Sequence, residues 1–438
     1  MKRGFGERVT DRSKEEQLQL TVPTSYVSQG FVRARVYSDT PAWQQALFVI
    51  WFFVLLIPID DFRLIRYACL AANLALFARY YERTLPLLFR AWPLLLFPIV
   101  AFVSIAWSTY PGQARTEGVL LLLTPLILVL FAVRLSPREF LRLMMFAGVL
   151  MVAYFLLQSI PIRGVGAIMH KQMLAYHFLL ISIAGLVVAL NRDEAPIYRL
   201  IGLLLFPVAF GMQLEAESVT SLLLGVAAIV GIAGSRFVWV PMSRVEHLRS
   251  VLVILVAIVS TATLLVFVSS PQGDIVSDFL DYFGKDSTLT GRTMIWDAAA
   301  SAAAEKPLAG HGLGGFWHPD VGRAQTIAEL NHSAPGTKVT FHSVFWEVRV
   351  HQGWIGIPFI FIALIWAFSR TILTWIRNAS FVNTGLLALS MITTATILTE
   401  SYLAAPINII VTTFYFSALT SFGFNAKRKL YRATPVPA

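Results

Sequence analysis

Residues 118–134 have the sequence GVLLLLTPLILVLFAVR, in which the only charged side chain is Arg134. A helix needs about 20 mostly apolar residues to cross the hydrocarbon core of a bilayer. Similar blocks recur along the 438-residue chain, which is 56% hydrophobic and only 14% charged. Soluble domains carry about 25% charged residues. The sequence therefore predicts an all-α polytopic membrane protein.

Twelve apolar blocks are predicted to be transmembrane helices. They lie at about residues 43–59, 65–79, 92–107, 118–134, 140–159, 172–190, 200–213, 218–234, 250–269, 354–374, 382–400 and 406–424. The predicted organisation is an N-terminal tail (1–41), transmembrane helices 1–9 (42–269), one large loop (270–353), transmembrane helices 10–12 (354–424) and a C-terminal tail (425–438). An even number of spans places both tails on the same side of the membrane.

The basic residues decide which side that is. Of the 35 Lys and Arg, 24 lie in the two tails and in the alternate loops on their side. By the positive-inside rule both tails are cytoplasmic, and the large loop faces outward. The net charge of +10 follows from this topology, because the basic residues lie in the tails and between the membrane spans instead of clustering on a soluble domain. It therefore does not indicate nucleic-acid binding.

The large loop is predicted to be partly helical. Residues 291–305 (GRTMIWDAAASAAAE) are rich in alanine, with Thr290 as a possible N-cap and Pro307 as a stop. A flexible turn is expected after this helix, at Gly310, Gly312, Gly314 and Gly315. No Lys-Ser or Lys-Thr follows these glycines, so they do not indicate a nucleotide phosphate loop.

The end of the loop, residues 341–356 (FHSVFWEVRVHQGWIG), contains a candidate general base. His342 is expected to begin a helix that continues into the membrane. At 100° per residue, Gly353 and Gly356 lie about 20° and 40° from the direction of His342. The imidazole and the two glycines, which allow close helix packing, are therefore expected along one face of the helix. A histidine titrates near neutrality, which suits a base that accepts a proton from an alcohol. The alternative is a structural histidine at the membrane edge.

Arg349 follows His342 by nearly two helical turns, so both side chains are expected on one face. A guanidinium there favours the neutral, proton-accepting imidazole or holds an anion beside it. The alternative is that Glu347, Arg349 and His351 are simply solvated.

Further cations on the outer side are candidates for binding an anion. Arg292 begins the predicted loop helix, where free N–H groups and the helix dipole attract phosphate; the alternative is a salt bridge to Asp286 or Asp297. Arg163 and Lys171 lie between the fifth and sixth spans, against the positive-inside trend, and Arg115 is a weaker member of the set. Ordinary lipid phosphate is their alternative partner. The outer acidic residues lie at span edges without an Asp-x-Asp pair, so no metal site is predicted.

The order of these motifs resembles the bacterial O-antigen ligase family, within a group that also contains O-antigen polymerases and protein O-oligosaccharyltransferases. His342-Ser343, nine residues and then Gly353-x-x-Gly356 is similar to the ligase pattern of His, Asn/Ser/Gln, nine residues and Gly-x-x-Gly.

Other segments carry the same resemblance. Residues 286–296 (DSTLTGRTMIW) and 306–317 (KPLAGHGLGGFW) are similar to the loop signature of the group, and 107–111 (WSTYP) and 166–172 (GAIMHKQ) to its weaker early motifs. Many relatives have Ser-Arg at the start of the eighth span, where this chain has Ser218-Val219. Arg163 or Arg349 is expected to supply that positive charge here, if it is needed.

The resemblance implies a GT-C-like fold in the bacterial inner membrane, with the active site on the periplasmic side. The implied reaction is the transfer of a glycan from a polyprenyl (undecaprenyl) diphosphate donor to a sugar hydroxyl of lipid A–core in lipopolysaccharide assembly, with inversion at the anomeric carbon. His342 would take the proton of the attacking hydroxyl. Arg292, with Arg163 and Lys171, would neutralise the diphosphate leaving group. No nucleotide, metal or other cofactor is implied, because the donor is already activated.

Two alternative functions remain open. An O-antigen polymerase or a protein O-oligosaccharyltransferase would use the same scaffold, although the single large loop and the His-Ser-to-Gly spacing favour a ligase. A secondary transporter also fits twelve spans, but neither paired halves nor mid-membrane charges are apparent.

Overall fold

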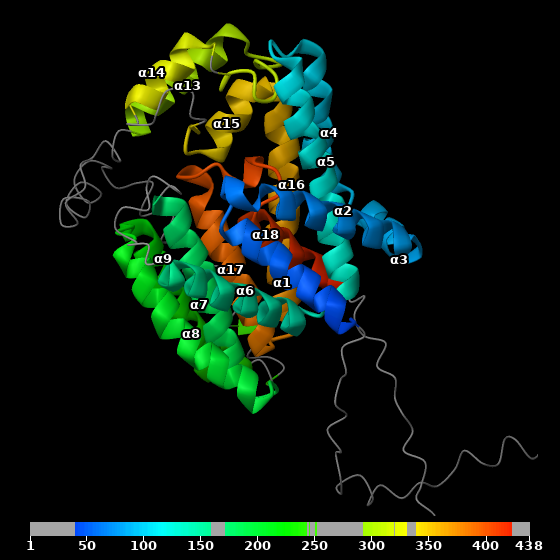
Figure 1. Ribbon diagram of the computed structural model, residues 1–438, viewed down its shortest axis with the longest axis vertical. Coiled ribbons are helices and arrows are strands. Elements are labelled where there is room, and N and C mark those ends of the chain that lie inside the picture. Colours follow the sequence, from blue (N-terminus) through cyan, green and yellow to red (C-terminus); the bar gives the residue numbers. More distant parts are fainter. Residues whose placement is uncertain are drawn as a thin grey trace, which may run out of the picture. The chain divides into compact units, whose positions relative to one another are not determined.

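The computed structural model describes residues 40–158, 171–242, 245, 250–251, 292–318, 320–330 and 339–422 (Figure 1). Every regular element among these residues is a helix, so the predicted all-α class is confirmed. Six of the described helices are long and apolar enough to cross a membrane. They are α5 (Pro111–Arg134), α6 (Pro137–Leu157), α7 (Lys171–Leu190), α8 (Pro196–Glu215), α9 with its continuation (Val219–Met242) and α16 (Gly353–Arg377).

These six helices coincide with six of the predicted spans. Three shorter apolar helices, α1 (Ala42–Leu56), α17 (Phe381–Ala395) and α18 with its 3₁₀ extension (Ile409–Phe422), coincide with the first, eleventh and twelfth. The predicted span at 250–269 lies almost entirely outside the described residues. The count of twelve is therefore not confirmed.

The second and third predicted spans differ from the structure for a physical reason. α2 (Arg63–Arg79) is a helix with several basic residues, and it is not among the apolar helices. α3 (Tyr81–Arg90) and the helical segment Pro93–Trp107 (α4, Pro93–Val103, then η4, Ser104–Trp107) meet at an angle of 85°. Pro93 starts the second arm, where its missing N–H costs no helical hydrogen bond. The segment 92–107 is thus one arm of a bent pair.

α7 is the most buried of the six long apolar helices, and small residues let its neighbours approach closely. A Cβ atom at Gly202 of α8 would lie 2.5 Å from the carbonyl oxygen of Gly185 in α7. A Cβ atom at Gly385 of α17 would lie 2.6 Å from a methyl group of Val187. Larger side chains at these positions would force the helices apart.

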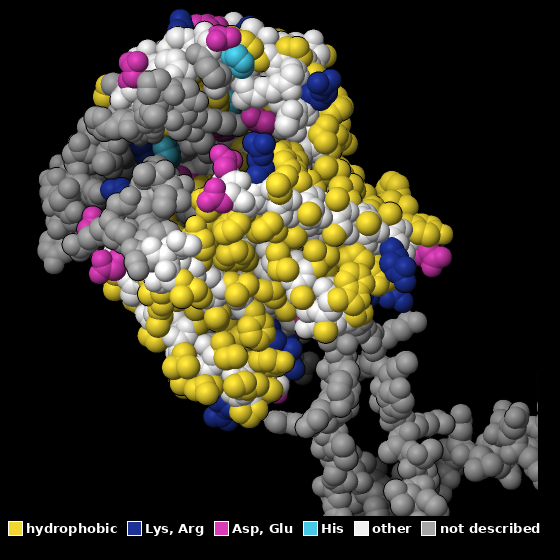
Figure 2. Space-filling view, in the orientation of Figure 1, with side chains coloured by type: hydrophobic (Ala, Val, Ile, Leu, Met, Phe, Trp, Pro, Cys, Tyr) yellow, Lys and Arg dark blue, Asp and Glu magenta, His cyan; other side chains and the backbone are white. Residues whose placement is uncertain are grey.

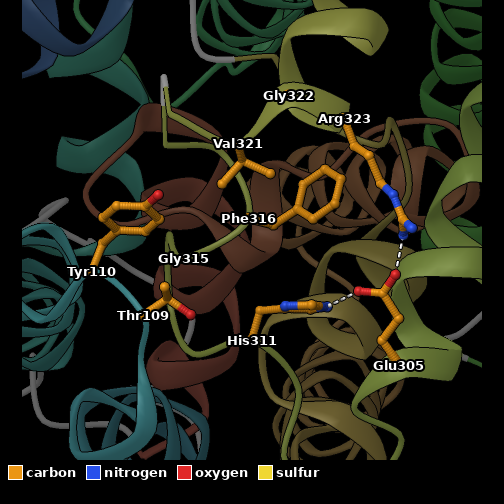
Figure 3. A pocket seen from close by; sticks show the side chains of 9 residues that line it. All are labelled: Thr109, Tyr110, Glu305, His311, Gly315, Phe316, Val321, Gly322 and Arg323. Atoms are coloured by element: carbon orange, nitrogen blue, oxygen red, sulfur yellow. Dashed lines mark hydrogen bonds and ion pairs between the residues drawn. The ribbon is translucent and has the colours of Figure 1, made fainter.

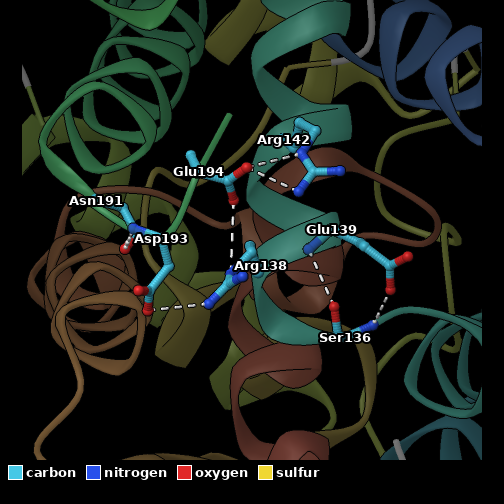
Figure 4. A network of polar contacts seen from close by, with 7 residues as sticks. All are labelled: Ser136, Arg138, Glu139, Arg142, Asn191, Asp193 and Glu194. Carbon is cyan, nitrogen blue, oxygen red and sulfur yellow. Dashed lines mark hydrogen bonds and ion pairs between the residues drawn. The ribbon is translucent and has the colours of Figure 1, made fainter. Parts of the chain in front are cut away.

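A charged network ties the start of α6 to the connection between α7 and α8 (Figure 4). The guanidinium of Arg142 lies 2.7 Å from the carboxylate of Glu194, whose side chain is 1% exposed. Arg138 lies 3.2 Å from Asp193. Ser136 caps the same helix in a capping box with Glu139. The network therefore fixes where α6 begins relative to the α7–α8 pair.

The surface of the described residues is apolar where membrane helices would meet lipid. Hydrophobic side chains cover the lower body in Figure 2, and charged groups gather above and below them. Leu203, Leu204 and Val230 on α8 and α9 are each about 60% exposed. Exposed apolar surface of this extent is typical of a membrane or protein interface.

Three helices, α13 (Arg292–Glu305), α14 (Gly322–Leu330) and α15 (Val344–His351), lie together at one end of the molecule (Figure 1). Their shared core contains Phe316, Trp317 and Phe341. The helix predicted over 291–305 is present from Arg292, whereas Thr290 and Gly291 lie outside the described residues. α15 leads directly into the membrane-type helix α16, so this group positions side chains at the end of the membrane helices.

Candidate functional site

A buried carboxylate, Glu400, joins residues that are distant in sequence. Its Oε2 lies 3.2 Å from Nδ1 of His342, and its Oε1 accepts a 2.9 Å hydrogen bond from NH2 of Arg292. The side chain of Glu400 is 4% exposed, and those of His342 and Arg292 are each 11% exposed. An imidazole, a carboxylate and a guanidinium thus form one contiguous cluster.

Arg292 also connects this cluster to the start of α7. Its Nη2 donates a 3.1 Å hydrogen bond to Oε1 of Gln172. Both of these hydrogen bonds are donated by Nη2 of Arg292. Lys171 is exposed at the first position of α7, next to Gln172. The predicted alternative was a salt bridge from Arg292 to Asp286 or Asp297; the one to Asp297 is not observed, and Asp286 lies outside the described residues.

Two tyrosines lie beside Glu400. The rings of Tyr176 and Tyr402 are 5.9 Å apart and nearly perpendicular. The hydroxyl of Tyr402, in η8 (Tyr402–Ala404), hydrogen-bonds Glu400. Burial, followed by the charge of Glu400, raises the pKa of Tyr402 well above its usual value. Tyr402 therefore remains a protonated donor to the carboxylate.

The backbone ahead of His342 is held from both sides. The N–H of Phe341 donates a 3.0 Å bond to Oε2 of Glu347, and the carbonyl of Phe341 accepts a 2.9 Å bond from the indole of Trp296. His342 itself has φ +49°, a left-handed conformation that costs energy for a residue with a side chain. These bonds place the imidazole firmly.

The prediction that His342 begins a helix continuing into the membrane is wrong. Ser343 is the N-cap of α15, which ends at His351, and α16 begins separately at Gly353. Gly353 has φ +64°, so the backbone direction changes there. His342 and the two glycines consequently do not share one helical stripe.

Gly353 does act as a close-packing notch. A Cβ atom at this position would overlap the backbone carbonyl of Leu308. The N–H groups of Trp354 and Ile355 bond the carbonyls of Pro307 and Leu308 at 3.0 and 3.1 Å. The loop after α13 therefore satisfies the first free donors of α16.

Arg349 does not contact His342 in the structure. Its NH1 donates a 2.8 Å bond to the carbonyl of Pro307, and its guanidinium lies 4.4 Å from the ring centroid of Trp354. Burial lowers the pKa of this guanidinium. Its neighbours Glu347 and His351 are also buried, so the solvated helical face considered as the alternative is wrong as well.

Among the described residues, no further predicted cation contacts Glu400. Arg115 is exposed on α5, and Arg163 lies outside the described residues. Their part in binding a diphosphate stays a prediction.

The glycine-rich segment after α13 forms the predicted turn, but it is firmly held. The indole of Trp107 donates to the carbonyl of Ala309 at 2.8 Å, and the hydroxyl of Ser104 accepts the N–H of Leu313 at 2.9 Å. The N–H of His311 bonds the carbonyl of Val350 at 2.9 Å. The early segment around Trp107 thus holds the loop through contacts about 200 residues apart in sequence.

The sequence identifies Glu400 only as one of the outer acidic residues at span edges and Gln172 only as the last residue of the early motif 166–172, and it gives Tyr402 no role. The one available signal for Glu400 was its charge within an otherwise apolar stretch. Nothing local showed that it would meet residues 58 and 108 positions earlier.

The fold and this cluster are those of a helical membrane protein with a buried imidazole at the end of its membrane helices. Residues 216–361 match the family described as O-antigen ligase. The chain is also 28% identical over 285 residues to the exopolysaccharide production protein ExoQ of Rhizobium meliloti (strain 1021), and the alignment covers 62% of this chain. These matches confirm the resemblance to the O-antigen ligase family.

The alignment with ExoQ spans 63% of that protein's length, which is less than two thirds. The segment that matches the family contains Arg292 and His342 but ends before Glu400.

Proposed function

We propose that this protein is a metal-independent inverting glycosyltransferase that moves a glycan from polyprenyl diphosphate to a sugar hydroxyl of lipid A–core. The observation that carries the proposal is the single carboxylate of Glu400, which contacts both His342 and Arg292. A base for the acceptor and a cation for the leaving group are then coupled through one side chain.

In this reaction His342 accepts the proton of the acceptor hydroxyl. When Nδ1–H donates to Glu400, the other ring nitrogen, Nε2, carries the lone pair that takes the proton; this tautomer is assigned from the hydrogen bond. The acceptor oxygen forms a bond to the anomeric carbon while the bond from that carbon to the diphosphate oxygen breaks. The diphosphate leaves on its polyprenyl chain.

The charges within the cluster suit this sequence of events. In this proposal the charges of Arg292 and Glu400 cancel before reaction, and the imidazole must be neutral in order to accept the proton. Proton transfer to His342 gives the cluster a net positive charge at the moment when negative charge grows on the leaving diphosphate. The buried carboxylate also stabilises the imidazolium, as in triads in which an acid orients the histidine. Low exposure strengthens both interactions.

Other cations complete the proposed donor site. Lys171, exposed beside Gln172, supplies a further charge for the diphosphate, with Arg163 from the preceding segment. Arg115 on α5 and Arg349 are weaker candidates, because Arg349 already bonds Pro307 and Trp354. In this proposal the chain has twelve spans in the inner membrane, cytoplasmic termini and a periplasmic site.

A second candidate is a polysaccharide polymerase, in which the acceptor is the end of another glycan. The relative named as an exopolysaccharide production protein favours this candidate. The same cluster would serve, because the attacking group is again a sugar hydroxyl.

The test is transfer by the purified protein in detergent, with polyprenyl-diphosphate glycan as donor and lipid A–core as acceptor. We expect His342→Ala to lower turnover by about a hundred- to ten-thousandfold and Arg292→Ala to weaken donor use as well. Exposed Arg192→Ala is the control. Near-normal turnover by folded His342→Ala would refute the assignment of the base. Elongation of donor glycan with lipid A–core ignored would favour the polymerase.

A further inference from the structure

A pocket of about 360 Å³ lies at the far end of α13 from Arg292 (Figure 3). Ligand pockets begin at about 300 Å³, so this one is large enough for a small ligand or for part of a larger one. Thr109 and Tyr110 lie on one side, Glu305 and Arg323 on the opposite side, with Phe316 and His311 between them. The cluster around Glu400 uses none of these residues.

The polar wall of this pocket is electrically balanced. The carboxylate of Glu305 pairs with the guanidinium of Arg323 and lies 3.8 Å from Nε2 of His311. Because the carboxylate of Glu305 pairs with the guanidinium of Arg323, these two charges cancel. A free anion would meet this carboxylate, so the wall does not favour phosphate. It instead presents charged donors and acceptors side by side, a pattern that suits adjacent hydroxyl groups.

The opposite wall is aromatic and rigid. The ring of Tyr110 is stacked on His318, with centroids 3.6 Å apart and planes within 5°. Phe316 is buried, and its ring also packs against Phe341, the neighbour of His342, at 5.2 Å. The C–H face of a sugar ring packs well against such aromatic side chains, while its hydroxyls need polar partners.

The loop that forms the pocket is held in place in advance of any ligand. The imidazole of His311 bonds the carbonyl of Ala302 at 2.9 Å, and the indole of Trp107 bonds that of Ala309. A Cβ atom at Gly315, which lines the pocket, would overlap the carbonyl of His311. Little conformational entropy is therefore lost when a ligand binds.

We propose that this pocket binds an uncharged saccharide unit of the glycan that the protein transfers or of the core that accepts it. The inference rests on the proposed function, because Phe316 connects the pocket through Phe341 to His342. A sugar chain attached at the reacting centre would pass along α13 to reach the pocket. The pocket would then select for glycans several sugar units long.

Binding is tested with the full-length protein in detergent micelles by titration calorimetry. The probes are the glycan released by mild acid from the polyprenyl-diphosphate pool of the source cells and, separately, lipid-free core oligosaccharide. We expect Arg323→Ala and Tyr110→Ala to weaken binding of one probe about tenfold, and Arg192→Ala to leave it unchanged. Unchanged binding by both pocket variants would overturn the inference, and so would displacement of the glycan by inorganic phosphate.

Transfer assays identify which saccharide is bound and separate the two proposals. A tenfold higher KM for long donors, with kcat and the KM for single-sugar donors unchanged, assigns the pocket to the donor glycan. A higher KM for full-length core alone assigns it to the acceptor. If the wild type transfers nothing while the variants still lose glycan binding, the proposed function fails and the saccharide site stands. Normal KM values of both pocket variants for long donors and for full-length core overturn the site alone.

Discussion

The side chains of Glu400 and His342 meet at 3.2 Å, Oε2 to Nδ1, although 58 residues separate them in the chain. The other oxygen of the same carboxylate holds Arg292 at 2.9 Å. A change at position 400 must therefore act on the proposed base and on the proposed diphosphate ligand together.

Glu400→Gln keeps the size of the side chain and one oxygen acceptor but removes the negative charge. We expect kcat to fall by about a hundredfold or more, because the imidazolium that forms during reaction loses its counter-charge. Turnover is measured at saturating donor and acceptor, with thermal unfolding as the test of folding. The matched control is Glu329→Gln on the exposed face of α14. Equal turnover in wild type and Glu400→Gln would show that the carboxylate has no part in the reaction.

Tyr402→Phe removes a buried donor to Glu400 and should reveal a pH-dependent contribution to stability. The pKa of Tyr402 is raised by burial and by Glu400, so the folded protein binds this proton more tightly than the unfolded chain. The contribution is fully present below pH ~10, the value for unfolded tyrosine, and is lost as the pH rises further. We expect Tyr402→Phe to cost about 1 kcal/mol at pH 8 and less at pH 10.5. Melting temperatures of both proteins at the two pH values provide the measurement, and a difference that grows with pH would contradict it.

Arg349→Lys separates a structural role from a catalytic one. The guanidinium is planar, stacks on Trp354 and bonds the carbonyl of Pro307, and an ammonium group cannot reproduce both contacts. We expect the free energy of unfolding to fall by about 1–2 kcal/mol while the folded fraction keeps its turnover. Arg192→Lys, at an exposed position between α7 and α8, is the control. A large loss of kcat without loss of stability would show that Arg349 takes part in the reaction.

The fold class follows from the sequence because hydropathy is a local property. The apolar runs at 118–134 and 172–190 need no knowledge of their neighbours to be recognised as helices. The bend of 85° between α3 and Pro93–Trp107 is different. It depends on how both arms pack against α5 and on how the second arm packs against α16, and a one-dimensional pattern does not contain that information.

The sequence predicts two members of the candidate site but not the residue that joins them. His342 and Arg292 carry local signals, a titratable ring in a motif and a cation at a helix start. Glu400, which contacts both of them, carries no such local signal, because it comes from a different segment and is brought in by the packing of α17 and α18. Arg349 and His342 were expected on one helical face because both were placed in the same helix. The helix begins after its N-cap Ser343, so His342 lies outside it and helical periodicity does not relate the two side chains.

Gly353→Ala tests whether the break between α15 and α16 is needed for folding. Residue 353 has φ +64°, and a Cβ atom there would overlap the carbonyl of Leu308, so alanine is strained and also pushes the loop away. We expect a loss of about 1–3 kcal/mol in the free energy of unfolding from the backbone conformation alone, and lower turnover, because the same loop positions the segment that leads to His342. Gly231→Ala in α9 is the matched control, since its added methyl group meets nothing within 4 Å. If both variants unfold at the same temperature as the wild type, the left-handed turn at residue 353 is not what holds α15 and α16 apart.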